Sequence, residues 1–204
     1  MNDLEFYINK YSYVYENDNI DLSFVPMMLR RKLSPLNKYA FYTLNNCFDE
    51  NIENIIYSSK NGELDKLNSL IKQYKSDNEV SPSMFSNSVH NSTMGLFSLF
   101  KKYNNKYTAL AACENTFSMG LLNAITDNSS DKLYCYADKT NKVSSISIYL
   151  SKNIKKNISQ KYKLKICNNN IKTENEAEDF IHFLKGECNI IQYSIFQIER
   201  VQND

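Results

Sequence analysis

The sequence predicts one α/β domain, and three observations support this fold class. Short apolar stretches with the period of strands alternate along the chain with longer stretches that have the period of helices. The length of 204 residues suffices for a single domain with a substantial core. Three of the four glycines, at positions 62, 95 and 120, fall within the β–α core and not in surface loops, and a glycine inside a helix, as at 95 and 120, often permits close approach of another backbone.

The composition is that of a soluble globular protein, with 42% apolar and 23% charged residues. Because 24 basic residues nearly balance 23 acidic ones, no overall charge attracts nucleic acid or an anionic membrane. No apolar run approaches the roughly 20 residues that a membrane-spanning helix needs. The first residues lack the basic and apolar segments of a signal peptide. We therefore expect a cytoplasmic protein without nucleic-acid partners or membrane insertion.

The cysteines indicate reduced thiols and no metal site. No pair has the CxxC spacing, and only two histidines are available as further ligands, so a zinc site would need widely scattered residues. We expect neither a metal nor another cofactor. Four of the five cysteines fall on apolar faces and are predicted to be core residues: Cys47, Cys135, Cys167 and Cys188.

The first part of the chain predicts two strands, at 4–15 and 54–59, each followed by a helix. Ser34 is a suitable N-cap and Pro35 a suitable first residue for the first of these helices. Gly62 separates the second strand from its helix. One face of that second helix is apolar and is expected to be buried; its members are Leu64, Leu67, Leu70, Ile71 and Tyr74.

The central stretch, residues 81–127, predicts a loop, a helix, a short buried strand, a sharp turn and a second helix. The first helix starts near residues 90–92 and is apolar over most of its circumference, so we expect it to be deeply buried. Cys113 falls in the turn between the strand and the second helix. A thiol at such a junction has the position of a nucleophile.

The last part of the chain predicts four strands and a helix. Thr173 followed by Glu176 has the spacing of a capping box, and Gly186 is a helix C-terminal signal. Two of the strands are separated by a turn-prone segment and are expected to be adjacent and antiparallel. The predicted ranges are 133–138 and 143–151 for these two strands, then 161–167 for a strand, 174–186 for the helix and 188–201 for a final strand.

Six segments, taken together and in order, resemble the β-ketoacyl synthase-like N-terminal domain family over roughly residues 24–150. The segments are RRKLS (30–34), SSKNGEL (58–64), SPSMFSNSVHN (81–91), MGLFSL (94–99), TALAACENTFSMGLLNA (108–124) and YAD (136–138). The resemblance implies a thiolase-like half-fold, in which helices flank a mixed β-sheet. Residues 151–204 would then be a C-terminal β-α-β extension of one domain spanning 1–204.

The resemblance also carries a candidate site. In true ketosynthases a loop of the type SPxxxxxxxxN precedes a helix with an early glycine, and a small-residue strand then ends in the nucleophilic cysteine. Those features match Ser81-Pro82, Asn91, Gly95 and Cys113. Two departures oppose condensation: Glu114 follows the cysteine where small residues are usual, and the family often has glycine at the cysteine position. Both active-site imidazoles of a ketosynthase come from a C-terminal half that this chain is too short to contain.

Each candidate residue has a structural alternative. The helix macrodipole would favour a thiolate at Cys113 while the adjacent Glu114 disfavours it, and the alternative role of Cys113 is a small buried residue on a turn. His90 is the histidine nearest in sequence and is a candidate general base, or else a helix-entry residue bonded to the backbone. Ser88, Asn91 and Glu114 either bind substrate or shape the loop.

Two functional hypotheses remain. The first, implied by the resemblance, is an accessory or partner protein in fatty-acid or aryl-polyene-type biosynthesis that is not a self-sufficient condensing enzyme. It would bind an acyl carrier protein or a ketosynthase subunit, or form a homodimer, near the strand before Cys113. The second is a small acyltransferase, of the 3-oxoacyl-acyl-carrier-protein synthase type, or a thioesterase, using Cys113 with His90. Asp138, at a strand end, is expected to anchor a turn or a partner.

Overall fold

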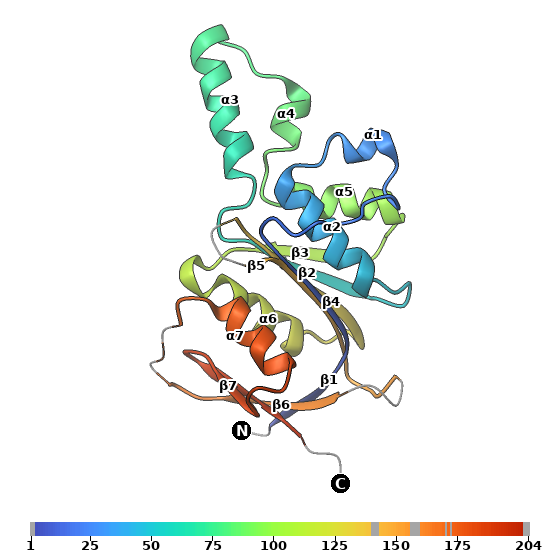
Figure 1. Ribbon diagram of the computed structural model, residues 1–204, viewed down its shortest axis with the longest axis vertical. Helices are drawn as coiled ribbons and strands as arrows, with labels where there is room; N and C mark the ends of the chain where they lie inside the picture. Colours follow the sequence, from blue (N-terminus) through green and yellow to red (C-terminus); the bar gives the residue numbers. More distant parts are fainter. Residues whose placement is uncertain (1–2, 140–142, 156–159, 170, 172, 202–204) are drawn as a thin grey trace.

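Across the residues that the computed structural model describes (3–139, 143–155, 160–169, 171 and 173–201), eight strands form one mixed sheet with helices on both faces (Figure 1). This architecture confirms the predicted α/β class. The strands are β1 (Leu4–Tyr15), β2 (Asn54–Ser58), β3 (Lys106–Leu110), β4 (Asp131–Ala137), β5 (Val143–Ser151), β6 (Gln160–Ile166), β7 (Ile190–Gln192) and β8 (Phe196–Arg200). The helices are α1 (Met27–Arg30), α2 (Pro35–Cys47), α3 (Leu64–Asp77), α4 (Pro82–Ser86), α5 (Ser92–Lys101), α6 (Thr116–Thr126) and α7 (Glu176–Leu184).

The sheet has the strand order β3-β2-β4-β5-β1-β6-β8-β7. Strands β3, β2 and β4 are parallel, because helical crossovers connect them, and the other neighbouring pairs are antiparallel. The predicted antiparallel pair of strands is confirmed as β4 and β5, with Tyr134 opposite Ile148. Residues 140–142 of the turn between them lie outside the described residues. Strand β6 pairs with the free edge of β1, so the C-terminal segment continues the same sheet.

Local sequence signals in the first part of the chain are confirmed. Helix α2 begins at Pro35, and the hydroxyl of Ser34 accepts a hydrogen bond of 3.0 Å from the backbone N–H of Asn37. Strand β2 is buried along its whole length, as expected for a parallel strand covered on both faces.

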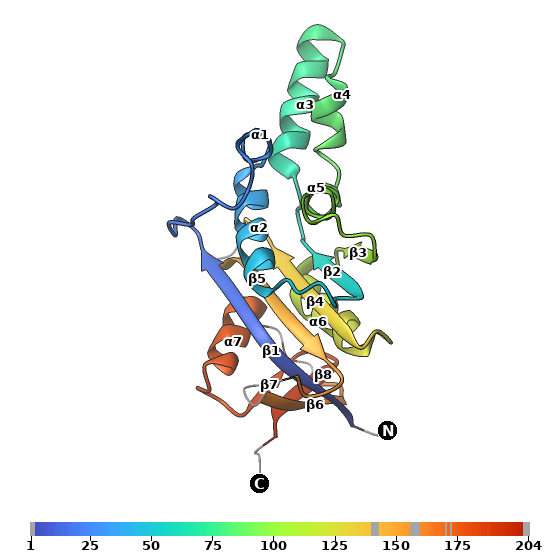
Figure 2. The ribbon, with the colours of Figure 1, turned by 90° about the vertical axis from the view of Figure 1, so that its right-hand side faces the viewer.

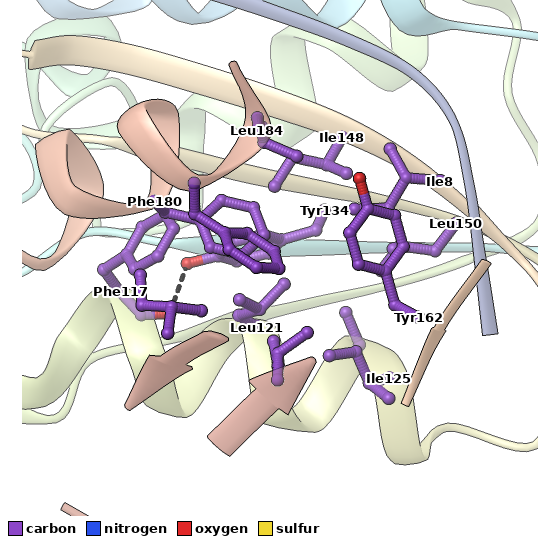
Figure 3. Packing of buried hydrophobic residues seen from close by; sticks show 14 of the residues in the cluster. Ile8, Phe117, Leu121, Ile125, Tyr134, Ile148, Leu150, Tyr162, Phe180 and Leu184 are labelled. Carbon is purple, nitrogen blue, oxygen red and sulfur yellow. Dashed lines mark hydrogen bonds between the residues drawn. The ribbon is translucent and has the colours of Figure 1, made fainter. Parts of the chain in front are cut away.

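Two hydrophobic cores fill the faces of the sheet. Helices α2 and α5 cover one face, and α6 and α7 cover the other. In the second core Phe117 of α6 packs beside Phe180 of α7 and beside Tyr134 of the sheet (Figure 3). The Tyr134 hydroxyl donates a 2.7 Å hydrogen bond to the carbonyl of Phe117. Side chains of the C-terminal extension therefore complete the core beneath α6.

The final predicted strand is wrong as a single element, because the chain folds there into the β7–β8 hairpin. Tyr193 and Phe196 are both buried, with ring centroids 4.9 Å apart. Residues three apart point to opposite faces of a straight strand, so their contact requires a turn. The backbone N–H of Tyr193 closes this turn on the carbonyl of Phe196 at 2.8 Å. The extension is thus β-α-β-β instead of β-α-β.

The predicted capping box is also wrong. Helix α7 begins at Glu176, Asn175 occupies the N-cap position, and the Glu176 carboxylate bonds to Ser118 of another helix instead of to its own backbone. The C-terminal signal is confirmed, since Gly186 lies just beyond the helix with a left-handed φ of +87°.

Burial of the cysteines follows the prediction at two of four positions. Cys47 and Cys135 are buried, whereas Cys167 is half-buried and Cys188 is exposed. The apolar pattern was misleading at these two positions because Cys167 follows the end of β6 and Cys188 precedes the start of β7. Both therefore lie in connections, outside the regular alternation of the strands.

Helix α3 shows the largest departure from the predicted burial. Leu70 alone of its apolar face is buried, and Leu64, Leu67, Ile71 and Tyr74 remain 43–55% exposed. The reason is visible in both views, where α3 and α4 project together beyond the end of the sheet (Figures 1 and 2). We call these two helices and the segment joining them, residues 64–86, the projecting hairpin.

Helix α5 is only partly buried. Met94 and Phe97 are in the core as expected, but Leu99 is 78% exposed. Within the described part of the chain, no helix combines the length and apolar character needed to cross a membrane.

Candidate functional site

The carboxyl ends of the parallel strands β2, β3 and β4 meet at one edge of the sheet, and the turns that follow them build the candidate site. Cys113 opens a single 3₁₀ turn, Cys113–Asn115, that leads directly into α6. The structure therefore places the thiol in the turn that the sequence predicts. Cys113 is exposed and has a φ of +50°, a left-handed conformation that residues other than glycine adopt rarely.

Thr116 stabilises this unusual backbone. Its hydroxyl donates to the carbonyl of Cys113 at 2.7 Å and accepts from the N–H of Ala112 at 2.9 Å. The N–H of Asn115 also bonds to the carbonyl of Ala112, at 3.1 Å. These bonds hold the cysteine at a sharp strand-to-helix corner, a geometry that exposes a nucleophile.

Glycine 120 sets α6 close to the sheet. A Cβ built on Gly120 would lie 2.7 Å from both the Ser58 hydroxyl oxygen and a ring carbon of Tyr134, so the glycine permits close packing there, against side chains of the sheet and not against the backbone that was expected. At Gly95 a Cβ would meet no atom within 4 Å, and the same expectation is wrong. Helix α5 does not approach another backbone at that position.

Charged side chains from three elements surround the Cys113 turn. The Lys60 ammonium, after β2, lies 2.6 Å from the carboxylate of Glu114, and this hydrogen bond raises the pKa of Lys60. Glu176, from α7, accepts hydrogen bonds from the Ser118 N–H at 3.0 Å and the Ser118 hydroxyl at 2.7 Å. Burial raises the pKa of Glu176. A small cavity of about 40 Å³ lies among these groups and is lined by Lys60, Cys113, Glu114 and Glu176 with Thr116, Phe117, Tyr136, Glu174 and Ala177.

His90 is bonded to the backbone. Its Nε2 lies 2.7 Å from the carbonyl oxygen of Ser59, so this nitrogen carries the proton and donates it. The ring also packs on Gly62, where an added Cβ would lie 3.1 Å from the imidazole. These contacts give His90 the local role that the sequence left open, and its pairing with Cys113 stays a prediction.

The loop before α5 is held by its own short-range bonds. The Ser88 hydroxyl donates to the carbonyl of Phe85 at 2.8 Å, next to the end of α4. Asn91 occupies the N-cap position of α5 without a side-chain cap bond, and its carbonyl accepts from Gly95 at 3.0 Å. Both positions therefore have the geometry of loop-shaping residues.

Asp138 anchors the turn that carries Lys60. Its carboxylate is 1% exposed and accepts hydrogen bonds from the backbone N–H groups of Lys60, at 2.6 Å, and Asn61, at 3.1 Å. Hydrogen bonds to a charged group contribute more than neutral ones. Of the two roles predicted for Asp138, the structure thus shows the turn anchor.

Replacing Asp138 with asparagine is expected to destabilise the protein by about 2 kcal/mol, because the charge-assisted bonds that its buried carboxylate accepts are weakened. Urea unfolding monitored by circular dichroism measures this loss. Asp65→Asn is the matched control, since Asp65 makes an exposed ion pair with Lys139 whose removal is expected to cost less than about 0.5 kcal/mol. Equal stability of the two variants would contradict the anchoring role.

Sequence reasoning missed Glu176 and Ser118 as neighbours of the candidate site. Their contact joins positions 58 residues apart, so no local pattern reports it. Among the residues that the structure describes, no three His, Cys, Asp or Glu side chains are grouped closely enough to hold a metal ion.

Comparisons with known proteins agree with this geometry. The family described as "Beta-ketoacyl synthase, N-terminal domain" matches residues 8–141, which is more than half of the chain. Among solved structures 31 chains match. One belongs to the complex of a ketosynthase (ApeO) with its chain length factor (ApeC) from Xenorhabdus doucetiae, with a TM-score of 0.72 and 18% identity over 98% of this chain and 100% of that chain. The likeness confirms the thiolase-like fold. Among curated proteins none matches.

Proposed function

Because this chain belongs to the family of β-ketoacyl synthase N-terminal domains, we propose that it acts as a ketosynthase-like partner subunit in fatty-acid or aryl-polyene-type biosynthesis. In this role it binds a ketosynthase subunit or an acyl carrier protein and does not condense acyl groups by itself. The solved chain described above supports the proposal, since it is similar over its full length and is part of a ketosynthase–chain length factor complex. We place this activity in the cytoplasm, where the five unpaired cysteines would stay reduced.

The projecting hairpin is the observation that carries the proposal. Its apolar side chains are exposed although they follow the regular spacing of a helix face made for packing, and large exposed apolar patches mark interaction sites. On α4 the side chain of Phe85 is also exposed, at 60%. Its exposed apolar residues are Leu64, Leu67, Ile71, Tyr74, Val80, Met84 and Phe85.

The charge of the same segment favours a protein partner. Three lysines, at 66, 72 and 75, balance three acidic residues, at 65, 77 and 79. A neutral surface of this kind gives no attraction to nucleic acid, whose binding depends on neutralising phosphates. The partner should therefore present a complementary apolar surface.

Strand β3 offers a second surface for the partner. It is the outermost strand at one end of the sheet and pairs on one side with β2. An outer strand can extend a sheet across a subunit boundary through main-chain hydrogen bonds. This is the strand that precedes Cys113, where the resemblance to ketosynthases implies docking of a ketosynthase or of a second copy.

One observation favours the alternative, a small acyltransferase or thioesterase. Cys113 is exposed on a corner with a left-handed φ of +50°, as a working nucleophile would be. Against it, His90 donates its Nε2 proton to a backbone carbonyl. The two functions differ in whether Cys113 accepts an acyl group.

Incubation with acyl-carrier-protein thioesters of several chain lengths, followed by intact-mass spectrometry, separates them. We expect no acyl adduct on the wild-type chain, because a partner subunit does not carry the growing acyl group. A condensing enzyme with its own active cysteine, treated in the same mixture, must become acylated as the positive control. Stoichiometric acylation that disappears in Cys113→Ala would instead establish the enzyme.

A further inference from the structure

The amino end of α6 is occupied by a carboxylate from the C-terminal extension. The first N–H groups of a helix have no partner within the helix and attract anions. At α6 one of them, the Ser118 N–H, donates to Oε2 of Glu176, while the Ser118 hydroxyl donates to Oε1. Both of these hydrogen bonds favour the ionised carboxylate, whereas burial raises the pKa of Glu176. The side chain lies in a buried position, at 8% exposure.

A positively charged side chain from the sheet binds the carboxyl end of α6. The buried ammonium of Lys132, from β4, donates to the carbonyl oxygens of Ile125 at 3.4 Å and Asp127 at 3.0 Å. A helix dipole corresponds to about half a unit charge at each end, so a full side-chain charge at each end more than balances it. The ionised form of Glu176 therefore offsets the positive amino end of α6, and Lys132 offsets the negative carboxyl end.

This compensation affects the cysteine that precedes α6. In a reactive turn, the positive amino end of the helix and nearby cations stabilise the thiolate. Here Glu176 binds the amino end of α6, and Lys60, a cation that lines the same cavity as Cys113, is paired with Glu114. Asp138 binds the backbone of the Lys60 turn and adds a further negative charge on that side. The remaining titratable groups of the cavity are Tyr136 and Glu174.

We propose that Glu176 is a positioning residue that keeps the Cys113 turn unreactive by occupying the amino end of α6 and placing a negative charge in the cavity that Cys113 also lines. The proposal rests on the non-condensing role given above and supplies a physical cause for it within this chain. Glu176 acts through α6 and the thiol, and it touches no substrate. Glu176 belongs to α7, which covers one face of the sheet together with α6. The projecting hairpin lies elsewhere, beyond the end of the sheet (Figure 1).

The test is the rate of Cys113 alkylation by iodoacetamide between pH 6 and pH 10, read by peptide mass spectrometry on the folded, full-length chain. Glu176→Gln retains the side-chain shape and removes the charge, and we expect it to react about 3- to 10-fold faster near neutral pH, with its profile moved to lower pH. Glu174→Gln is the matched control, because Glu174 lines the same cavity but is exposed. Its profile should follow the wild type. Superimposable profiles for Glu176→Gln and the wild type would overturn the proposal.

A second measurement does not depend on how the variant folds. Wild-type Cys113 should react no faster at pH 7 than the cysteine of an unstructured peptide with the sequence of residues 111–115. A wild-type rate at least tenfold above the peptide would show a reactive turn and overturn the proposal even if Glu176→Gln fails to fold. Binding of a ketosynthase partner, measured in parallel, should be unchanged in Glu176→Gln. The reactivity proposal can therefore fail while the proposed partner function holds, and the two outcomes are distinguishable.

Discussion

Replacing Gly120 with alanine is expected to destabilise the protein by about 3 kcal/mol, the upper part of the usual cost of overpacking a core. The added methyl group would lie 2.7 Å from the Ser58 oxygen and from the Tyr134 ring. Neither neighbour can move away easily. Their hydroxyl groups are hydrogen-bonded to each other at 2.8 Å, and Tyr134 is also bonded to Phe117. Thermal unfolding should show a melting temperature lower by roughly 6–12 °C for a chain of this size.

Gly95→Ala is the matched control for Gly120→Ala. Both glycines lie inside helices, but a Cβ at Gly95 meets no atom within 4 Å. Alanine is favoured over glycine in a helix by up to about 1 kcal/mol, so Gly95→Ala should leave stability unchanged or raise it. Equal effects of the two substitutions would mean that α6 does not approach the sheet as closely as the structure shows.

Introducing charge on the projecting hairpin should strongly weaken partner binding. We expect the double substitution Leu67→Glu with Ile71→Glu to weaken binding of a ketosynthase subunit by at least about 100-fold, because both carboxylates would lose water at an apolar interface. Both side chains are exposed in the isolated chain, so the melting temperature should change little. Isothermal titration calorimetry with the purified partner measures the loss.

Ile154→Glu is the control for this surface. Ile154 is an exposed apolar residue between β5 and β6, outside the projecting hairpin. The Ile154→Glu variant should bind the partner with the affinity of the wild-type chain. Unchanged affinity of the double variant would exclude the projecting hairpin as the docking surface.

The sequence predicted well those elements whose structure is determined by residues close together in the chain. Helix α2 begins where Ser34 and Pro35 indicate, because an N-cap hydroxyl and a residue with a fixed φ act within one turn of chain. Strand β2 was recognisable as a continuous apolar run, which a parallel strand covered on both faces requires. The turn at Cys113 was also recognisable, since it separates a small-residue strand from an apolar helix, although that strand, β3, has no buried residue and its predicted burial was wrong.

The features that sequence did not predict depend on distant partners. The apolar face of α3 predicted the helix correctly. Amphipathicity shows which face of a helix is suited to packing, but it does not show whether another element covers that face. Glu176 was read as part of a capping box because Thr173 lies three residues before it. Its partner Ser118 lies 58 residues away, and a pattern within one helix cannot report that contact.

The most direct test of the central claim is native mass spectrometry of this chain mixed with the ketosynthase of a fatty-acid or aryl-polyene-type pathway from the same organism. The account predicts a heterodimer whose condensing activity requires the cysteine of the ketosynthase and is unaffected by Cys113→Ala in this chain. It would be contradicted if no complex forms and this chain, by itself, condenses acyl and malonyl thioesters through Cys113.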